Sequence, residues 1–143
     1  MTYINNQIHL KGDYRREEAL AAGTITPGML IEETAAGTYQ AHSSSGGSAE
    51  LLVAVEDALQ GNTITDDYSA DDLVSANVEL PGNRCQMFLL AGETVVIGTW
   101  LESAGDGTLQ AYTSGVKVAI AKEAKDLSAS GAVAALLDVA FVV

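Results

Sequence analysis

Apolar and polar residues alternate over short stretches along most of the chain. Every second residue between positions 73 and 80 is apolar, which is the pattern of a half-buried β-strand. Residues 116–121 alternate in the same way. The continuous apolar run at 51–55 instead predicts a strand that is buried on both faces. The β-rich residues 133–143 predict a closing strand. Residues 94–101 are apolar on both faces as well and are expected to form one central strand.

Turn residues separate these stretches. Pro27-Gly28 precedes an apolar run, and proline followed by glycine is the preferred pair of a type II turn. Residues 35–37, Pro81-Gly82 and residues 105–107 mark further turns. The pattern gives roughly eight or nine short strands at regular spacing, which is typical of a small β-barrel or β-sandwich. A helical turn is expected within residues 122–131, so the fold should be mainly β with at most short helices.

The first 22 residues differ from the rest. Polar residues interrupt their apolar positions, so no regular period emerges. We expect residues 1–22 to form an extended N-terminal arm, with a short solvated helix at 14–22, ahead of a β-rich body at 23–143. The apolar residues of the arm are Tyr3, Ile4, Ile8, Leu10 and Tyr14.

Charge limits the partners of this chain. Its 143 residues include 7 basic and 19 acidic side chains, a formal net charge of −12. Nucleic acid and an anionic membrane surface are therefore not expected as partners, since both attract basic proteins. No apolar run approaches the ~20 residues of a membrane helix, and the first residues do not read as a secretory signal. The single cysteine excludes an internal disulfide and a cluster of thiolate ligands.

Residues able to carry out chemistry are few. His9 and His42 are expected to be solvated surface histidines, because neither lies in a group with ligand spacing. Cys85 opens an apolar stretch and is expected to be a small buried hydrophobe. Serines 43–45 follow His42, but a mobile loop cannot preorganise a catalytic triad. We therefore expect neither an enzyme nor a cofactor-dependent protein.

Two further features have a functional and a structural interpretation. Four carboxylates crowd one short stretch and could bind a hard cation such as Ca²⁺, although a solvated acidic loop is the simpler interpretation. They are Asp66, Asp67, Asp71 and Asp72. Trp100, the one tryptophan, is expected to pack in the core rather than to serve as a ligand platform.

The order of several motifs resembles the head decoration, or capsid cement, proteins of tailed bacteriophages. The resemblance covers roughly residues 19–143. Its motifs are GTITPGMLI at 23–31, LVAVED at 52–57, YSADDLV at 68–74, LPG at 80–82, LLAGE at 89–93, GTWL at 98–101, VAIA at 118–121 and the apolar end at 136–143. The longer arm before Gly23 and the pair Asp71-Asp72 depart from the pattern of the family.

The resemblance implies a non-enzymatic protein with a compact, β-tulip-like body. Such a protein is made in the host cytoplasm and binds the major capsid protein on the outer surface of an expanded capsid. Trimers are the usual state, and dimers occur. An N-terminal arm commonly adds to capsid strands, which needs backbone hydrogen bonds and little side-chain specificity.

From the residues of the arm we predict the capsid contact. Its apolar side chains would be buried on docking, and its basic ones would meet acidic capsid groups. The predicted set is Tyr3, Ile4, Ile8, Leu10, Tyr14, Arg15 and Arg16.

Two other functional classes remain open. A β-sandwich displayed on the virion could recognise carbohydrate or a host surface through exposed aromatic residues, for which Tyr39, Tyr68 and Tyr112 are candidates. A small hydrolase is the least favoured class, because no convergent catalytic group is evident.

Overall fold

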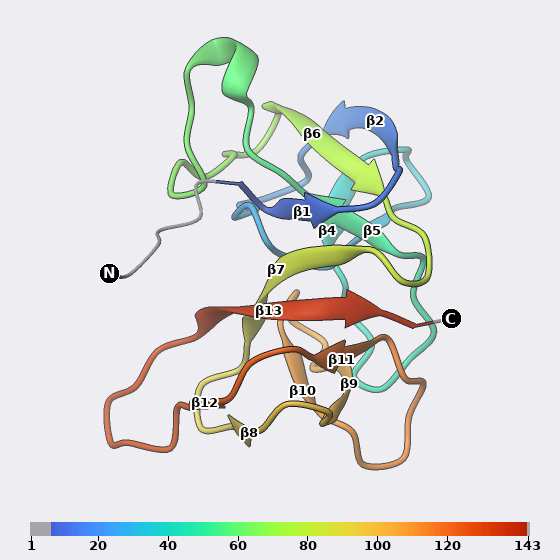
Figure 1. Ribbon diagram of the computed structural model, residues 1–143. Coiled ribbons are helices and arrows are strands. Elements are labelled where there is room, and N and C mark those ends of the chain that lie inside the picture. Colours follow the sequence, from blue (N-terminus) through green and yellow to red (C-terminus); the bar gives the residue numbers. More distant parts are fainter. Residues whose placement is uncertain (1–6, 143) are drawn as a thin grey trace.

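Five strands of the computed structural model close into a barrel (Figure 1). The structure describes residues 7–142. Around the barrel run β7 (Arg84–Leu89), β10 (Leu109–Ala111), β9 (Trp100–Ser103), β11 (Ala119–Ala121) and β13 (Ala135–Phe141). Antiparallel pairing of β13 with β7, from Ala135↔Leu89 to Ala140↔Arg84, closes the ring. The predicted mainly β fold with a small barrel is confirmed.

The other edge of β7 is shared by two strands. The N-terminal strand β1 (His9–Lys11) pairs at its start, where His9 lies opposite Cys85, and β10 pairs at its end, at Leu89. Large apolar side chains fill the core of this half of the molecule; they include Ile8, Met87, Leu101, Leu109, Leu137 and Phe141. Burying each one fully contributes about 1.5–3 kcal/mol.

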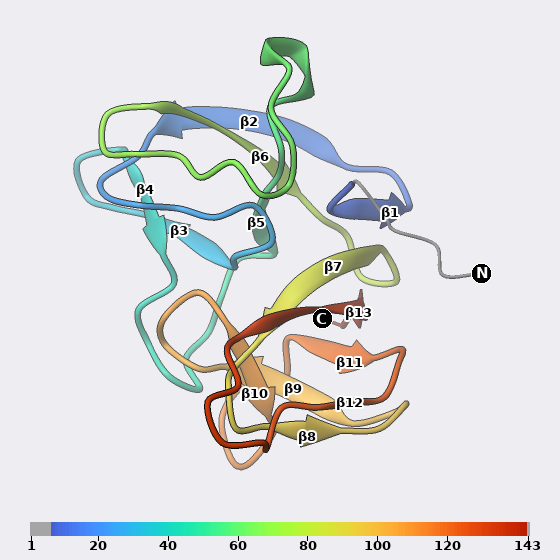
Figure 2. The same cartoon turned by 90° about the vertical axis from the view of Figure 1, so that its left-hand side faces the viewer.

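A second group of strands packs on the barrel (Figure 2). It consists of a three-stranded antiparallel sheet and a hairpin. The sheet has the order β2 (Arg15–Leu20), β6 (Leu73–Val78), β5 (Leu52–Ala54), and the hairpin is β3 (Ile31–Glu33) with β4 (Tyr39–Ala41). A 3-10 turn, η1 (Ala58–Gln60), follows β5, and β8 (Thr94–Val95) pairs with β12 (Lys125–Asp126) beside the barrel.

The strand β5 lies between two cores. Val53 and Val55 belong to the barrel core, whereas Leu52 and Ala54 belong to the core of the three-stranded sheet. Successive side chains of a strand point to opposite faces, so the uninterrupted apolar run here reflects burial on both sides, as predicted. The turn at Pro27-Gly28 is confirmed too: Met29 N–H donates to Thr26 O at 3.1 Å, and Gly28 has φ +100°.

The expected central strand at 94–101 is wrong. A turn at Gly98, with φ +95°, separates β8 from β9. It leaves Val96 and Ile97 62% and 68% exposed. Trp100 is 40% exposed rather than buried, and the Lys117 ammonium lies 4.6 Å from the centre of its ring. The apolar residues on both faces reflect a surface turn rather than double burial.

The N-terminal segment also differs from its prediction. Residues 15–20 form the strand β2 instead of a helix, because all six pair with β6, from Arg15↔Val78 to Leu20↔Leu73. Ile8 is completely buried. From residue 7 onward, the expected arm is therefore part of the β-sheets. Residues 122–131 contain β12 and turns instead of a helical turn. Within residues 7–142, no helix is both long and apolar enough to span a membrane.

Candidate functional site

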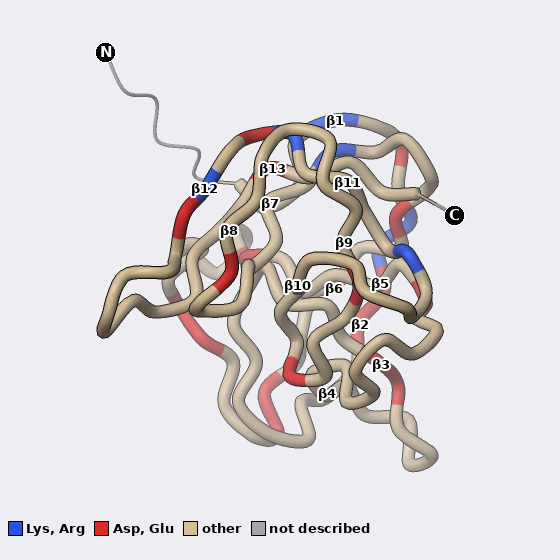
Figure 3. Tube along the Cα trace, turned by 90° about the horizontal axis from the view of Figure 1, so that it is seen from below, with Lys and Arg blue, Asp and Glu red and all other residues tan. Residues whose placement is uncertain are grey.

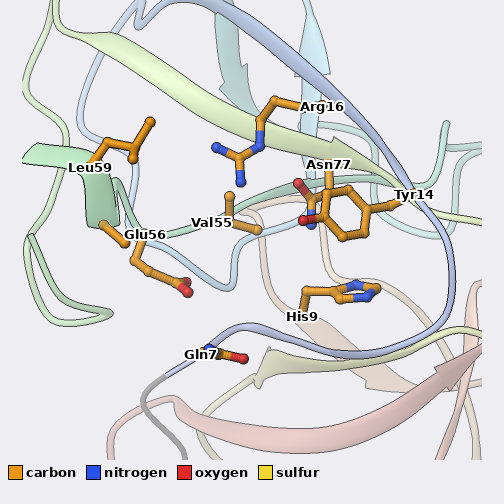
Figure 4. Close-up of a pocket in the computed structure, with 9 residues that line it drawn as sticks. Gln7, His9, Tyr14, Arg16, Val55, Glu56, Leu59 and Asn77 are labelled. Atoms are coloured by element: carbon orange, nitrogen blue, oxygen red, sulfur yellow. The ribbon is translucent and has the colours of Figure 1, made fainter.

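A groove of about 500 Å³ lies between β1, the β2–β6 sheet and the segment after β5. Figure 4 shows Arg16 reaching into it from β2, with Gln7 and His9 facing it from the β1 side. Arg16 and Asn77 are cross-strand partners, so their side chains project from the same face of the sheet. The remaining lining residues are Tyr14, Val55, Glu56, Ala58 and Leu59.

The groove offers unused polar and apolar groups. Among the described residues, no carboxylate oxygen lies within 4.0 Å of the Arg16 guanidinium, and Asn77 Oδ1 is buried without a hydrogen-bond partner. Leu59 is 93% exposed at one end, and Tyr14 is 43% exposed at the other. A free guanidinium beside apolar walls fits an extended polypeptide that carries a carboxylate.

Beneath the groove, a buried carboxylate organises a polar network. Glu79 is 3% exposed. Its Oε1 lies 2.7 Å from His9 Nδ1 and 3.1 Å from Cys85 Sγ, and its Oε2 accepts a hydrogen bond from Asn83 Nδ2 at 2.7 Å. The other ring nitrogen of His9, Nε2, lies 2.7 Å from the carbonyl oxygen of Gly12. These contacts hold β1 against the barrel.

This network does not favour nucleophilic chemistry at Cys85. Burial, together with the neighbouring Glu79 carboxylate, raises the pKa of the thiol far above its ordinary value. The thiolate is the nucleophile in cysteine chemistry, so a thiol held protonated is inert. Cys85 is buried, as predicted.

We expect Cys85 to react with a disulfide reagent such as DTNB at the rate of unfolding. Rapid labelling of the thiol in denaturant should contrast with slow labelling of the native protein. Native labelling as fast as that of a free thiol would contradict this burial.

The predicted capsid contacts fall into three groups. Tyr3 and Ile4 lie outside the described residues. Ile8 is in the core and cannot contact a partner surface, and Leu10 is half-buried. Tyr14, Arg15 and Arg16 are exposed and consecutive, but the Arg15 guanidinium pairs with Glu17 at 2.8 Å.

The four aspartates of the predicted cation site are exposed, and two of them serve local turns. Asp66 Oδ2 accepts a hydrogen bond from Thr63 N–H at 2.7 Å, and Asp72 Oδ2 accepts one from Ser69 N–H at 2.8 Å. Asp67 and Asp72 line a second shallow groove, and Asp71 has φ +71°. Across the described part of the chain, three or more potential metal ligands meet at one place, which is His9, Glu79 and Cys85. Cation binding by the aspartates stays a prediction.

Both histidine predictions are wrong. His42 is 3% exposed, and its ring nitrogens lie 2.7 Å from Ser103 Oγ and 2.9 Å from the carbonyl oxygen of Ser48. His9 contacts a carboxylate that is 70 residues away in the sequence. Local spacing carries no signal for Glu79 and Ser103, which lie 70 and 61 residues from their histidine partners, so neither contact could be predicted from the sequence.

The aromatic candidates for carbohydrate binding are reduced to one. Tyr39 and Tyr68 are 3% and 5% exposed, and burial, with nearby carboxylates, raises the pKa of Tyr39 to about 12. Tyr112 is half-buried near Trp100. The Lys117 ammonium lies over both rings, 4.6 Å and 5.2 Å from their centres, so it occupies a face of each ring on which a sugar would stack.

Charge is distributed unevenly over the molecule. Figure 3 shows basic and acidic residues together on the half that carries β1, β11 and β12, whereas acidic residues predominate around β3 and β4. With 19 acidic residues in the sequence, the acidic half should repel other acidic surfaces. A basic or neutral partner surface would therefore fit it best.

Comparison with protein-family models and with curated proteins finds no match. Among solved structures, the chain is similar to the N base of head fiber gp8.5 of bacteriophage phi29, with a TM-score of 0.59 and 15% sequence identity. The similarity covers 90% of this chain and 94% of that chain. At this identity the likeness establishes a common fold over nearly the whole chain.

Proposed function

We propose that this protein is a structural component of a phage virion that binds the outer surface of the expanded capsid and stabilises it. The observation that carries the proposal is the fold shared over 90% of the chain with the base of a phage head fiber. The ordered motifs that resemble head decoration proteins support it independently. Its partners would be the major capsid protein and other copies of itself, as a homotrimer or a dimer.

The structure offers a physical basis for such a role. Two cores joined through β5 give a rigid body, and the groove beside β1 provides a free guanidinium and exposed apolar side chains. We assign the capsid contact to Tyr14 and Arg16 at the groove, and to Tyr3 and Ile4 in the segment before it. Many identical weak contacts around a shell would act together through avidity.

Cosedimentation with expanded, undecorated phage heads tests this role. The wild-type protein should pellet with the heads, and Arg16→Glu should weaken binding at least about tenfold, because it places a negative charge where a carboxylate is expected to bind. Lys122→Glu makes the same charge change on exposed β-barrel surface and should bind as the wild type does.

Two outcomes would count against the proposal. Failure of the wild-type protein to pellet would contradict capsid binding. Equal binding by Arg16→Glu and the wild type would remove the groove from the contact, and a Tyr3→Ala/Ile4→Ala variant would then test the segment before it. Light scattering of the purified protein separates a trimer from a dimer and a monomer.

A further inference from the structure

Three side chains from distant parts of the sequence meet below the groove. They are His9 of β1, Glu79 after β6 and Cys85 of β7, and their ligand atoms all lie within 4.8 Å of one another. We propose that these residues bind one zinc ion, which fastens β1 to the barrel. This inference is independent of the proposed capsid role, because it concerns the isolated chain.

The ligand types identify the class of metal. Imidazole nitrogen, carboxylate oxygen and thiolate sulfur are the three ligands that zinc takes in proteins, whereas Ca²⁺ and Mg²⁺ take oxygen ligands. At metal–ligand distances of about 2.0–2.3 Å, two ligands of one ion lie about 3.2–3.8 Å apart. Cys85 Sγ and His9 Nδ1 are already 3.8 Å apart. The Oε1 atom, 2.7 Å from Nδ1 and 3.1 Å from Sγ, has to shift by about half an ångström.

Groups around the three ligands already hold them in place. His9 Nε2 lies 2.7 Å from the carbonyl oxygen of Gly12, which leaves Nδ1 to face the site. Asn83 Nδ2 donates to Glu79 Oε2 at 2.7 Å, and the backbone N–H of Leu10 hydrogen-bonds the sulfur of Cys85. Histidine ligands whose second nitrogen bonds a carbonyl, and carboxylates that are themselves hydrogen-bonded, are regular features of metal sites.

The side-chain amide of Asn77 lies beside these three ligands and could supply a further oxygen to the ion. Asn77 is 1% exposed, its Nδ2 lies 3.4 Å from Glu79 Oε1, and its Oδ1 has no partner among the described residues. A half-turn of the terminal amide exchanges the two atoms and brings the oxygen to the side of the ligands. Because Asn77 and His9 also line the groove, the ion has a path from the solvent.

Zinc binding also resolves an electrostatic conflict. Glu79 and Cys85 are 3% and 0% exposed, so the carboxylate disfavours a thiolate next to it. A divalent cation between them replaces the proton on Sγ and the hydrogen-bonding proton between His9 Nδ1 and Glu79 Oε1, and both protons leave to the solvent. The repulsion becomes attraction of both groups to the ion. The zinc ion would thus connect His9 of β1 to Glu79 and Cys85, which lie 70 and 76 positions further along the chain.

The test uses the full-length protein, stripped of metal with a chelator and then titrated with Zn²⁺ in a calorimeter. We expect one ion per chain and a higher melting temperature. Titration with Co²⁺ should produce a sulfur-to-cobalt charge-transfer band, which reports the Cys85 ligand directly and requires no variant. Absence of stoichiometric uptake, or a bound cobalt ion without that band, would overturn the proposal.

Variants separate this site from adventitious binding to an acidic surface. Cys85→Ala should abolish the charge-transfer band and weaken zinc binding at least about tenfold. If that variant does not fold, His9→Gln replaces a ligand near the surface and should weaken binding to a similar degree. The control Asp66→Asn/Asp67→Asn should bind as the wild type does. A loss of zinc in the control, with full binding by His9→Gln, would place the ion at the acidic loop instead.

Discussion

Replacing Gly115 by alanine is expected to lower the free energy of unfolding by about 3 kcal/mol, because overpacking against fixed backbone is costly. A Cβ at this position would lie 2.5 Å from the Cα of Gly46. The neighbouring backbone cannot yield easily, since Val116 N–H donates to Gly46 O and Gly46 N–H donates to Ser103 O. The backbones of Gly115 and Gly46 therefore pack so closely that there is room for the α-hydrogen of glycine but not for a methyl group.

Urea unfolding followed by Trp100 fluorescence measures the effect. Gly23→Ala is the matched control, because a Cβ there meets no atom within 4 Å and its backbone is outside the left-handed region. Its stability should stay within about 0.5 kcal/mol of the wild type. Equal stabilities of Gly115→Ala and Gly23→Ala would mean that the two loops separate freely.

Strand positions could be predicted where burial follows from the local sequence. The run at 51–55 and the alternation at 73–80 both contain strands, but the second is buried on both faces rather than one, because its polar residues Ser75 and Asn77 are 6% and 1% exposed. The prediction of one strand at 94–101 is wrong because Gly98 takes a left-handed conformation in the turn between β8 and β9. Apolar residues in a short exposed turn have the same local appearance as a buried strand.

The N-terminal segment shows the limit of local patterns. Arg15–Leu20 has charged residues and good helix formers, yet pairing with β6 makes it a strand. Tertiary pairing overrides a weak local preference. Most of the groove and the polar network below it could not be predicted, because His9, Glu79 and Cys85 are far apart in the sequence and meet only through the pairing of β1 with β7.

Burial of a predicted contact residue also changes the picture of docking. Ile8 lies in the barrel core, so a capsid partner cannot reach it without unfolding of β1. Docking would instead use side chains that remain exposed next to β1, of which Tyr14 and Arg16 border the groove. If the proposed zinc ion fastens β1, it fixes one wall of this groove while leaving its open face accessible.

The carboxylate of Glu102 should make the second large contribution to stability, and one that depends on pH. Glu102 is 3% exposed, and its Oε1 accepts hydrogen bonds from the backbone N–H groups of Thr113, Ser114 and Gly115 at 2.7, 3.3 and 3.3 Å. Gln110 Nε2 donates to the other oxygen at 3.1 Å. These donors lower the pKa of Glu102 below its ordinary value of 4.5.

Glu102→Ala should therefore lower the free energy of unfolding by about 3 kcal/mol at neutral pH, because hydrogen bonds to a charged group are strong. The variant also leaves the N–H groups of residues 113–115 without their acceptor. The folded state binds the proton less tightly than the unfolded state does. The contribution is thus fully present above pH ~5 and is lost as the pH falls below the ordinary value of 4.5 and through the lower folded pKa. Urea unfolding of wild type, Glu102→Gln and the exposed control Glu18→Ala between pH 7 and about pH 3 tests this. The difference in the free energy of unfolding between the wild type and Glu102→Gln should become smaller as the pH falls, because the protonated acid and the amide are alike in charge. A gap that stays constant with pH would show that the side chain acts through its shape rather than its charge.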